Sequence, residues 1–378
     1  MKSLGSLLAV AVIFVSSLQA REAQATVGLL KKGLALSASD AEKLEGRVSK
    51  KPKDEEARIQ LLSYYASIPA GADLAAVKAA RSSHIHWLIA NDPKDGLGLF
   101  HVLTGVYRLH CVGDDLADPA AAQRATELWV EQARKHQGKA EIRRRAAQAI
   151  RFCSPEQAEL ILTEDNDRAG LGNLYATAIL GITGESYVNN EMTGTDASFR
   201  ERPFAEKARR MLEQDGDGPL MAAAAGTLLR QGAILWADGK LDWDYTATGK
   251  NVLSKALVVA PDDLTLLTLP ITLPARGKRP PFTIKVGGSA QASKLVRKVP
   301  LVYPAAARDR GIQGTVQLTV LIGLDGKVLH VRANAGPAEL IPASLENVRQ
   351  WEYQPTTMIG EPCYVVTRVD LDYTLSAR

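Results

Sequence analysis

The fold of the last part of the chain is decided by the stretch GIQGTVQLTVLIGLDGKVLHVRA, residues 311–333. Apolar residues fill every second position over Val316–Ile322, which predicts a strand with one mostly apolar face. The pair Asp325-Gly326 is a strong signal for a tight hairpin turn. Residues 328–333 are therefore expected to return as the partner strand.

Helix and strand signals flank this hairpin. Pro304 suits the first position of a short helix, and Gly311 suits the residue that ends it. A second helix is expected from Pro342, with apolar residues on one side. These residues are Ile341, Leu345 and Val348. Apolar and polar residues alternate again over 365–375, so residues 297–378 are expected to form a small α+β domain with a three-stranded antiparallel sheet.

Five motifs follow one another through this domain. They are Tyr303-Pro304, the run from Gly311 to Val316, Asp325-Gly326, the run from Arg349 to Pro355 with Trp351 and Tyr353, and Gly360-Glu361-Pro362. In this order and spacing they resemble the C-terminal domain of the TonB family of periplasmic energy transducers. The resemblance covers residues 297–378.

The resemblance implies a partner and a binding mode. In this family the domain binds a peptide segment of an outer-membrane receptor, which adds as a strand to an exposed sheet edge. Inner-membrane proton-driven motor proteins supply the force. We expect the last strand to be that edge, although outward charges are also typical of a protected, unused edge. The candidate partner-binding residues are Val302, Tyr303, Pro304, Val365, Val366, Thr367, Arg368, Val369, Asp370 and Tyr373.

Two features of the motifs qualify this expectation. Val302 stands where the best-studied transducers have a glutamine, which puts the side-chain part of receptor recognition in question. Trp351 and Tyr353 are interpreted as core anchors of the domain rather than as ligand contacts.

Residues 1–25 have the layout of a signal peptide or membrane anchor. Lys2 precedes an apolar run from Leu4 to Val15, and small residues that suit cleavage follow, ending at Ala20 or Ala25. The run is shorter than the ~20 residues that a spanning helix needs. We therefore expect an exported, periplasmic protein, anchored in the inner membrane if residues 1–20 are retained.

Residues 26–269 are rich in helix-forming residues with apolar positions at helical spacing, as at Ala57, Leu61 and Leu62. We expect an α-helical solenoid of TPR-like (tetratricopeptide) type, although no fixed period of roughly 34 residues runs through it. An irregular helical bundle is the alternative. The concave surface of a solenoid is suited to a peptide or protein partner. The aperiodic stretch 184–202 is expected to be a long loop.

Residues 270–296 are rich in proline and basic residues, which predicts a linker. Fully extended, it would reach ~90 Å, and partial docking would shorten that reach. Two candidate short strands lie at its end, over residues 284–286 and 294–299.

Composition and motifs exclude several classes of function. The net charge of +4, from 46 basic and 42 acidic residues, is too balanced to indicate nucleic-acid binding. The cluster Arg143-Arg144-Arg145 is interpreted as a solvated helix face, and His84 and His86 as core or surface residues. No nucleophile elbow, phosphate loop or zinc spacing occurs in the sequence, so we expect no enzyme, cofactor or metal.

The cysteines leave two alternatives open. Cys111 and Cys153 could form a disulfide in an oxidising compartment, or remain buried and reduced. Cys363 is interpreted as a packing residue.

Two functions fit these observations. The first is a TonB-like protein that takes part in energy-coupled transport by binding outer-membrane receptors through strand addition. The second is an exported TPR-like scaffold that binds partner proteins without energy coupling. Retention of residues 1–20 favours the first, and a processed N-terminus favours the second.

Overall fold

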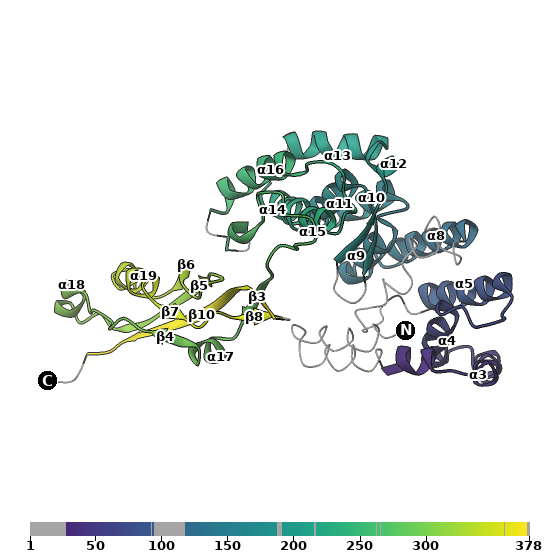
Figure 1. The fold of residues 1–378 in the computed structure, drawn as a ribbon, viewed down its shortest axis with the longest axis horizontal. Helices are drawn as coiled ribbons and strands as arrows, with labels where there is room; N and C mark the ends of the chain where they lie inside the picture. Colours follow the sequence, from purple (N-terminus) through teal and green to yellow (C-terminus); the bar gives the residue numbers. More distant parts are fainter. Residues whose placement is uncertain are drawn as a thin grey trace.

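The computed structural model of the 378-residue protein shows a helical N-terminal part and a small strand-containing C-terminal domain (Figure 1). It describes residues 28–91, 93, 118–186, 191–214, 217–261, 263–264, 266–358 and 360–375. The predicted signal segment and Cys111 lie outside the described residues, so the cleavage site and the Cys111–Cys153 disulfide remain predictions.

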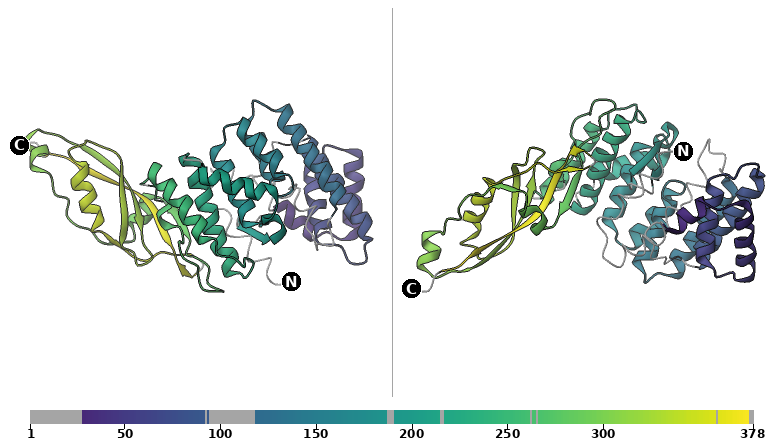
Figure 2. Two further views of the ribbon diagram at one scale, coloured as in Figure 1. Left: turned by 90° about the horizontal axis from the view of Figure 1, so that it is seen from above. Right: turned by 60° about the horizontal axis from the view of Figure 1, so that its bottom comes forward.

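The helical part is built from successive helices that stack away from the C-terminal domain, as all three views show (Figures 1 and 2). Its helices are α3 (Ala38–Lys50), α4 (Glu55–Ala66), α5 (Leu74–Asn91), α8 (Pro119–Lys135), α9 (Ala140–Ile150), α10 (Pro155–Glu164), α11 (Arg168–Leu180), α12 (Ala197–Arg200), α13 (Pro203–Gln214), α14 (Gly218–Gly226), the π-helix η1 (Thr227–Gln231), α15 (Gly232–Ala237), α16 (Thr246–Val259) and the 3-10 helix η2 (Leu266–Thr268). The prediction of a helical N-terminal part is confirmed. The helices differ in length, so they do not establish a tetratricopeptide solenoid.

A hairpin interrupts the helices where we expected a long loop. Strands β1 (Ile182–Ser186) and β2 (Glu191–Thr195) pair antiparallel, with register irregularities. The prediction of a loop over 184–202 is therefore wrong.

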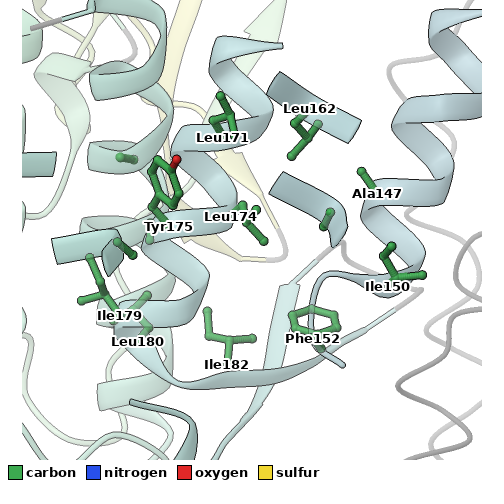
Figure 3. Packing of buried hydrophobic residues seen from close by; sticks show 14 of the residues in the cluster. Ala147, Ile150, Phe152, Leu162, Leu171, Leu174, Tyr175, Ile179, Leu180 and Ile182 are labelled. Atoms are coloured by element: carbon green, nitrogen blue, oxygen red, sulfur yellow. The ribbon is translucent and has the colours of Figure 1, made fainter. Parts of the chain in front are cut away.

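The core of the helical part surrounds α11 (Figure 3). Leu171, Leu174 and Tyr175 of this helix are buried among apolar side chains from α9, α10 and β1. Gly172 lets α14 approach closely, because a Cβ at this position would lie 2.1 Å from the carbonyl oxygen of Leu220. Burial of this apolar surface is the main term that stabilises the helical part.

The continuous run Gly218–Ala237, which joins α14, η1 and α15, has the length and apolar composition of a membrane span. Of its most apolar window, 67% is buried inside the protein. Core helices of water-soluble domains pass the same test, so the run carries little weight as a sign of membrane insertion.

One basic residue of the helical part departs from our expectation. Arg143 is only 3% exposed, and its guanidinium donates to Asp165 and Glu164, each at 2.6 Å, and to the carbonyl of Ala133 at 3.0 Å. The interpretation of Arg143 as part of a solvated face is therefore wrong. Its carboxylate partners lie more than twenty residues away in the sequence, at the C-terminal end of the next helix.

The segment after η2 is docked on the helical part. Arg276 stacks on the ring of Trp236 at 3.6 Å and donates to the carbonyl of Leu241 at 3.0 Å. Arg279 forms a two-point ion pair with Asp238, with distances of 3.0 and 2.6 Å. The linker therefore does not have the ~90 Å reach of an extended chain.

The C-terminal domain contains a four-stranded sheet in the order β3-β10-β5-β6. Its elements are β3 (Thr283–Val286), α17 (Gly288–Ala292), β4 (Leu295–Arg297), α18 (Ala305–Asp309), β5 (Gly314–Ile322), β6 (Val328–Ala335), α19 (Ile341–Arg349), β7 (Glu352–Tyr353), β8 (Thr357–Met358), β9 (Glu361–Pro362) and β10 (Tyr364–Tyr373). Two further strand pairs, β4-β7 and β8-β9, stand apart from this sheet.

The hairpin of this domain is confirmed. β5 and β6 pair antiparallel, and Gly326 adopts φ +84° in the turn between them. The prediction of a three-stranded antiparallel sheet is corrected by β3, which pairs parallel to β10 as a fourth strand. β3 confirms the candidate short strand over residues 284–286 of the predicted linker, but its four residues are too few to indicate that it joins the sheet of the terminal domain.

Trp351 anchors the core of this domain. Its side chain is 5% exposed, and its Nε1 donates to Asn347 Oδ1 at 3.0 Å. Asn347 in turn donates to the carbonyl of Pro300 at 2.8 Å, which fixes the entry to the domain. The interpretation of Trp351 as a core residue is confirmed.

Truncation of this ring should destabilise the domain. We expect Trp351→Ala to lower the free energy of unfolding by about 3–5 kcal/mol, because it leaves a cavity. Trp351→Phe, which keeps most of the packing but loses the Nε1 donor, should cost clearly less. Denaturant unfolding of the two variants checks this, and an unchanged transition for Trp351→Ala would contradict burial of the ring.

Candidate partner-binding site

Strand β10 lies between β5 and β3 for its first part and has one open side for its second part. It pairs with β5 along its length, whereas β3 covers Tyr364–Thr367 only. The expectation that the whole of residues 365–373 forms a free edge is therefore wrong at Val365–Thr367. From Arg368 to Tyr373, β10 has no strand on this side within the part of the chain that the structure describes.

The side chains of β10 fall on two faces. Val365, Thr367 and Tyr373 are buried in the domain, so a partner strand would meet these residues through their backbone. Arg368 and Asp370 are exposed and form an ion pair at 3.1 Å. The predicted alternation of buried and wet residues is confirmed here.

Val366 departs from this alternation for a structural reason. It belongs to the outward row with Arg368 and Asp370, yet it is 9% exposed because it packs with Leu264 and Leu321. Leu264 belongs to the helical part. Val366 is therefore a contact between the two parts of the chain, and its apolar character in a polar row is the sequence signal for that contact.

The Tyr303-Pro304 motif lies at the far end of β10. The Tyr303 ring packs edge-on against Tyr373, with ring centroids 5.3 Å apart, and its hydroxyl donates to the carbonyl of Ile312. Pro304 precedes the first residue of α18 as its N-cap. Val302 is 71% exposed beside this motif. The structure thus brings the Tyr303 motif and the open part of β10 together.

Sequence reasoning missed the residues at the near end of the open edge. Gln291 of α17 is 1% exposed, and neither its amide nitrogen nor its amide oxygen has a partner among the described residues. The buried hydroxyl of Thr367 has none either. Both residues line a cavity of about 650 Å³ that also borders Arg368 and Trp351. Unsatisfied buried polar groups cost about 1–3 kcal/mol each, so this corner favours a polar occupant.

The start of α17 lies directly against the edge. A Cβ at Gly288 would lie 2.6 Å from the carbonyl oxygen of Arg368, so only glycine allows this approach. No periodicity in residues 270–296 indicated α17 or Gln291, because their burial depends on a contact with β10.

Two titratable groups near this site are shifted by burial. Burial raises the pKa of Tyr353 to about 12, and burial also raises the pKa of the Cys363 thiol. Both groups therefore stay protonated near neutral pH. No cluster of three or more His, Cys, Asp or Glu side chains suited to a metal ion occurs in the described ranges.

His84 and His86 both contact residues of the helical part. His84 is buried between Glu45 and Arg58, at 3.0 and 3.2 Å. His86 Nε2 lies 2.9 Å from the carbonyl of Ala121. Both rings therefore belong to the packing of the helices.

Comparison with known protein families assigns the domain that carries this edge. Residues 299–375 match the family described as Gram-negative bacterial TonB protein C-terminal. This part of the chain is therefore similar to the C-terminal domain of TonB proteins. The match confirms the resemblance carried by the five motifs. Neither a curated protein nor a solved structure matches the chain.

The cover that β3 provides can be weakened by one substitution. Ile284→Pro removes a backbone donor from β3, and loss of about 1–1.5 kcal/mol of pairing should speed amide exchange at Tyr364–Thr367 about fivefold to tenfold. Hydrogen-exchange mass spectrometry measures this rate. Ile284→Ala keeps the donor and should have a smaller effect, and equal exchange in all three proteins would contradict the pairing.

Proposed function

We propose that this protein takes part in energy-coupled transport across the outer membrane by binding a receptor segment as an added strand on β10 of its TonB C-terminal domain. The observation that carries the proposal is the combination of the family match with a backbone edge over Val369–Tyr373 that no second strand covers within the described residues. Backbone groups left unpaired at a sheet edge favour pairing with another extended chain. The function is one of binding and force transfer, without enzymatic chemistry.

The contact between β3 and β10 supports the mode of binding. It is a parallel strand pair in the register Tyr364↔Thr283 to Thr367↔Val286. The same side of β10 can therefore accept an extended segment with regular geometry. A receptor segment either continues along the open part of β10 beyond Thr367 or displaces β3 to gain the full strand.

Strand addition also suits the mechanical role. Force along the strands loads several backbone hydrogen bonds in parallel, and such bonds need little side-chain specificity. The buried side chains of β10 are anchored in the core that includes Trp351, so force on the receptor segment would reach the whole domain.

The exposed residues of the site supply a limited side-chain contribution. We propose that Val302, Arg368 and Asp370 border the receptor segment, with Tyr303 and Pro304 at one end. Gln291 and Thr367, whose polar atoms are buried without partners, would pair with polar groups of the segment at the other end. Valine at 302 gives an apolar contact where the best-studied transducers have a glutamine.

A second function is favoured by one specific observation. β3 covers part of the edge, and Leu264 of the helical part packs on Val366 of β10. This arrangement also suits a scaffold in which the terminal domain is held by its own chain and the helical part binds a partner protein. Motor coupling would then be absent.

Site-directed cross-linking in cells tests the first function. A photoreactive amino acid at Asp370 should cross-link to outer-membrane receptors, identified by mass spectrometry. The matched control is Leu329, which is 56% exposed on β6 at the other side of the sheet. Equal labelling of receptors from both positions, or from neither, would contradict binding at β10.

Weaker pairing between β3 and β10 should increase binding of the receptor segment. If β3 competes with the receptor segment, Ile284→Pro should raise the Asp370 cross-link yield severalfold over the parent protein. An unchanged or lower yield would show that β3 and the receptor segment do not compete.

The state of the N-terminus separates the two functions. A transducer anchored to an inner-membrane motor requires residues 1–20, whereas the signal-peptide layout predicts mature protein that begins at Arg21 or Thr26. Mass spectrometry of the protein from fractionated cells decides between them. An intact N-terminus in membranes supports the transducer, and a processed soluble form supports a periplasmic accessory or scaffold.

A further inference from the structure

A cavity of about 770 Å³ lies at the junction between the helical part and β3. Its walls come from α9, α11, α14 and η1 on one side and from Thr283, Lys285 and Val366 on the other. Ligand pockets for small molecules typically have about 300–1,000 Å³, so the size suits a small molecule. The cavity is separate from the open edge of β10 described above.

The charges that line this cavity are mostly positive. Four basic side chains, Arg144, Arg151, Arg230 and Lys285, face one acidic side chain, Asp167. Asp167 is already paired with Arg144 at 2.9 Å. Asp167 is therefore not the counter-ion of Arg230 or Lys285.

Arg230 is the centre of this excess charge. It is half-buried, its Nη2 donates to Thr268 Oγ1 at a long 3.5 Å, and no carboxylate among the described residues pairs with it. Burial lowers the pKa of its guanidinium, yet an arginine stays charged in proteins. A desolvated charge without a counter-ion is costly, and a bound anion would remove that cost.

The local backbone at Arg230 is unusual as well. Residues Thr227–Gln231 form the π-helix η1 between α14 and α15. Such π-turns are rare and occur frequently at functional sites. This turn places both Thr227 and Arg230 on the cavity wall, with Thr227 Oγ1 donating to Asn173 Oδ1 at 2.8 Å.

A polar network links Arg230 to β3. Thr268 is bonded to Arg230 and also accepts from Thr283 Oγ1 at 3.0 Å. Thr283 is the first residue of β3, and Lys285 follows on the same strand. Lys285 is exposed and has no ion-pair partner within the described ranges, so its ammonium is available to a ligand in the cavity.

We propose that this cavity is a binding site for a small molecule with an oxyanion group, a carboxylate or a phosphate. Arg230 binds that group through its planar fork of donors, and Lys285 binds it from the opposite wall. The apolar residues Leu162, Leu174 and Leu266 accommodate the less polar part of the ligand.

A ligand held from both sides would also stabilise the docking of β3. It joins η1 to β3, so occupancy should slow the opening of the β3–β10 pair. Control of access to the receptor-binding edge by this ligand rests on the proposed function. Binding of the anion in the cavity is independent of the proposed function.

Calorimetry on the full chain tests the site, with inorganic phosphate and citrate as probes and glycerol as the uncharged control. We expect at least one anion to bind and glycerol not to bind. The tighter anion identifies the head group, and comparable binding of both supports a general oxyanion site. Failure of both anions to bind at millimolar concentration would overturn the proposal.

Variants locate the binding. Arg230→Gln should weaken it about tenfold to a hundredfold, because hydrogen bonds to a charged group are lost. Arg124→Gln is the matched control, since Arg124 is exposed on α8 and pairs with Glu127 at 3.1 Å. Arg230→Lys keeps the charge and remains informative if the glutamine variant fails to fold. Equal affinity in the Arg230 and Arg124 variants would overturn the assignment.

Hydrogen exchange separates this inference from the proposed function. The tighter probe should slow amide exchange at Tyr364–Thr367 in the parent protein and not in Lys285→Gln. This readout needs no receptor, so it can succeed even if receptor binding at β10 fails. Binding without slowed exchange would overturn the link to β3 and leave the anion site.

Discussion

Backbone pairing between β3 and the first four residues of β10 sets the arrangement of both parts of the protein. It draws the segment after the helices into the terminal sheet, while Arg276 and Arg279 hold the preceding residues on the end of α15. Leu264 then packs on Val366 across the junction. Each contact is modest, but together they fix how much of β10 is open. The position where β3 ends therefore defines the candidate binding edge.

Because β3 covers part of β10, only part of this sheet edge is available to another strand. An unprotected strand is an aggregation hazard, and natural proteins cover or charge such strands. Here β3 covers the first part of β10, and the ion-paired side chains of Arg368 and Asp370 border the second. A partner strand must gain enough backbone bonding to compete with a segment that is tethered to the same chain. On the proposed function, binding and self-cover would be two states of one edge, and groups that stabilise β3 would favour the covered state.

Much of the terminal domain could be predicted from the sequence because its signals are local. Alternation over Val316–Ile322, the Asp325-Gly326 turn and the apolar face of α19 each appear within a few residues. The candidate short strand over residues 284–286 is confirmed by β3, but its parallel pairing with β10 escaped prediction because the two strands lie far apart in the sequence. The burial of Gln291 and Arg143 escaped because both depend on partners distant in sequence. Val366 carried a usable signal, an apolar residue in an otherwise polar row.

The account predicts that the receptor segment and β3 compete for β10, and a reversible lock on β3 tests this most directly. Val286 and Thr367 are register partners, so cysteines at both positions are placed to form a disulfide across the pair. The ligand is the receptor segment that is identified by cross-linking from position 370. Its affinity is measured with the disulfide between positions 286 and 367 oxidised and then reduced. The account predicts strong loss of binding in the oxidised protein and recovery on reduction. Equal affinity in both states would contradict it.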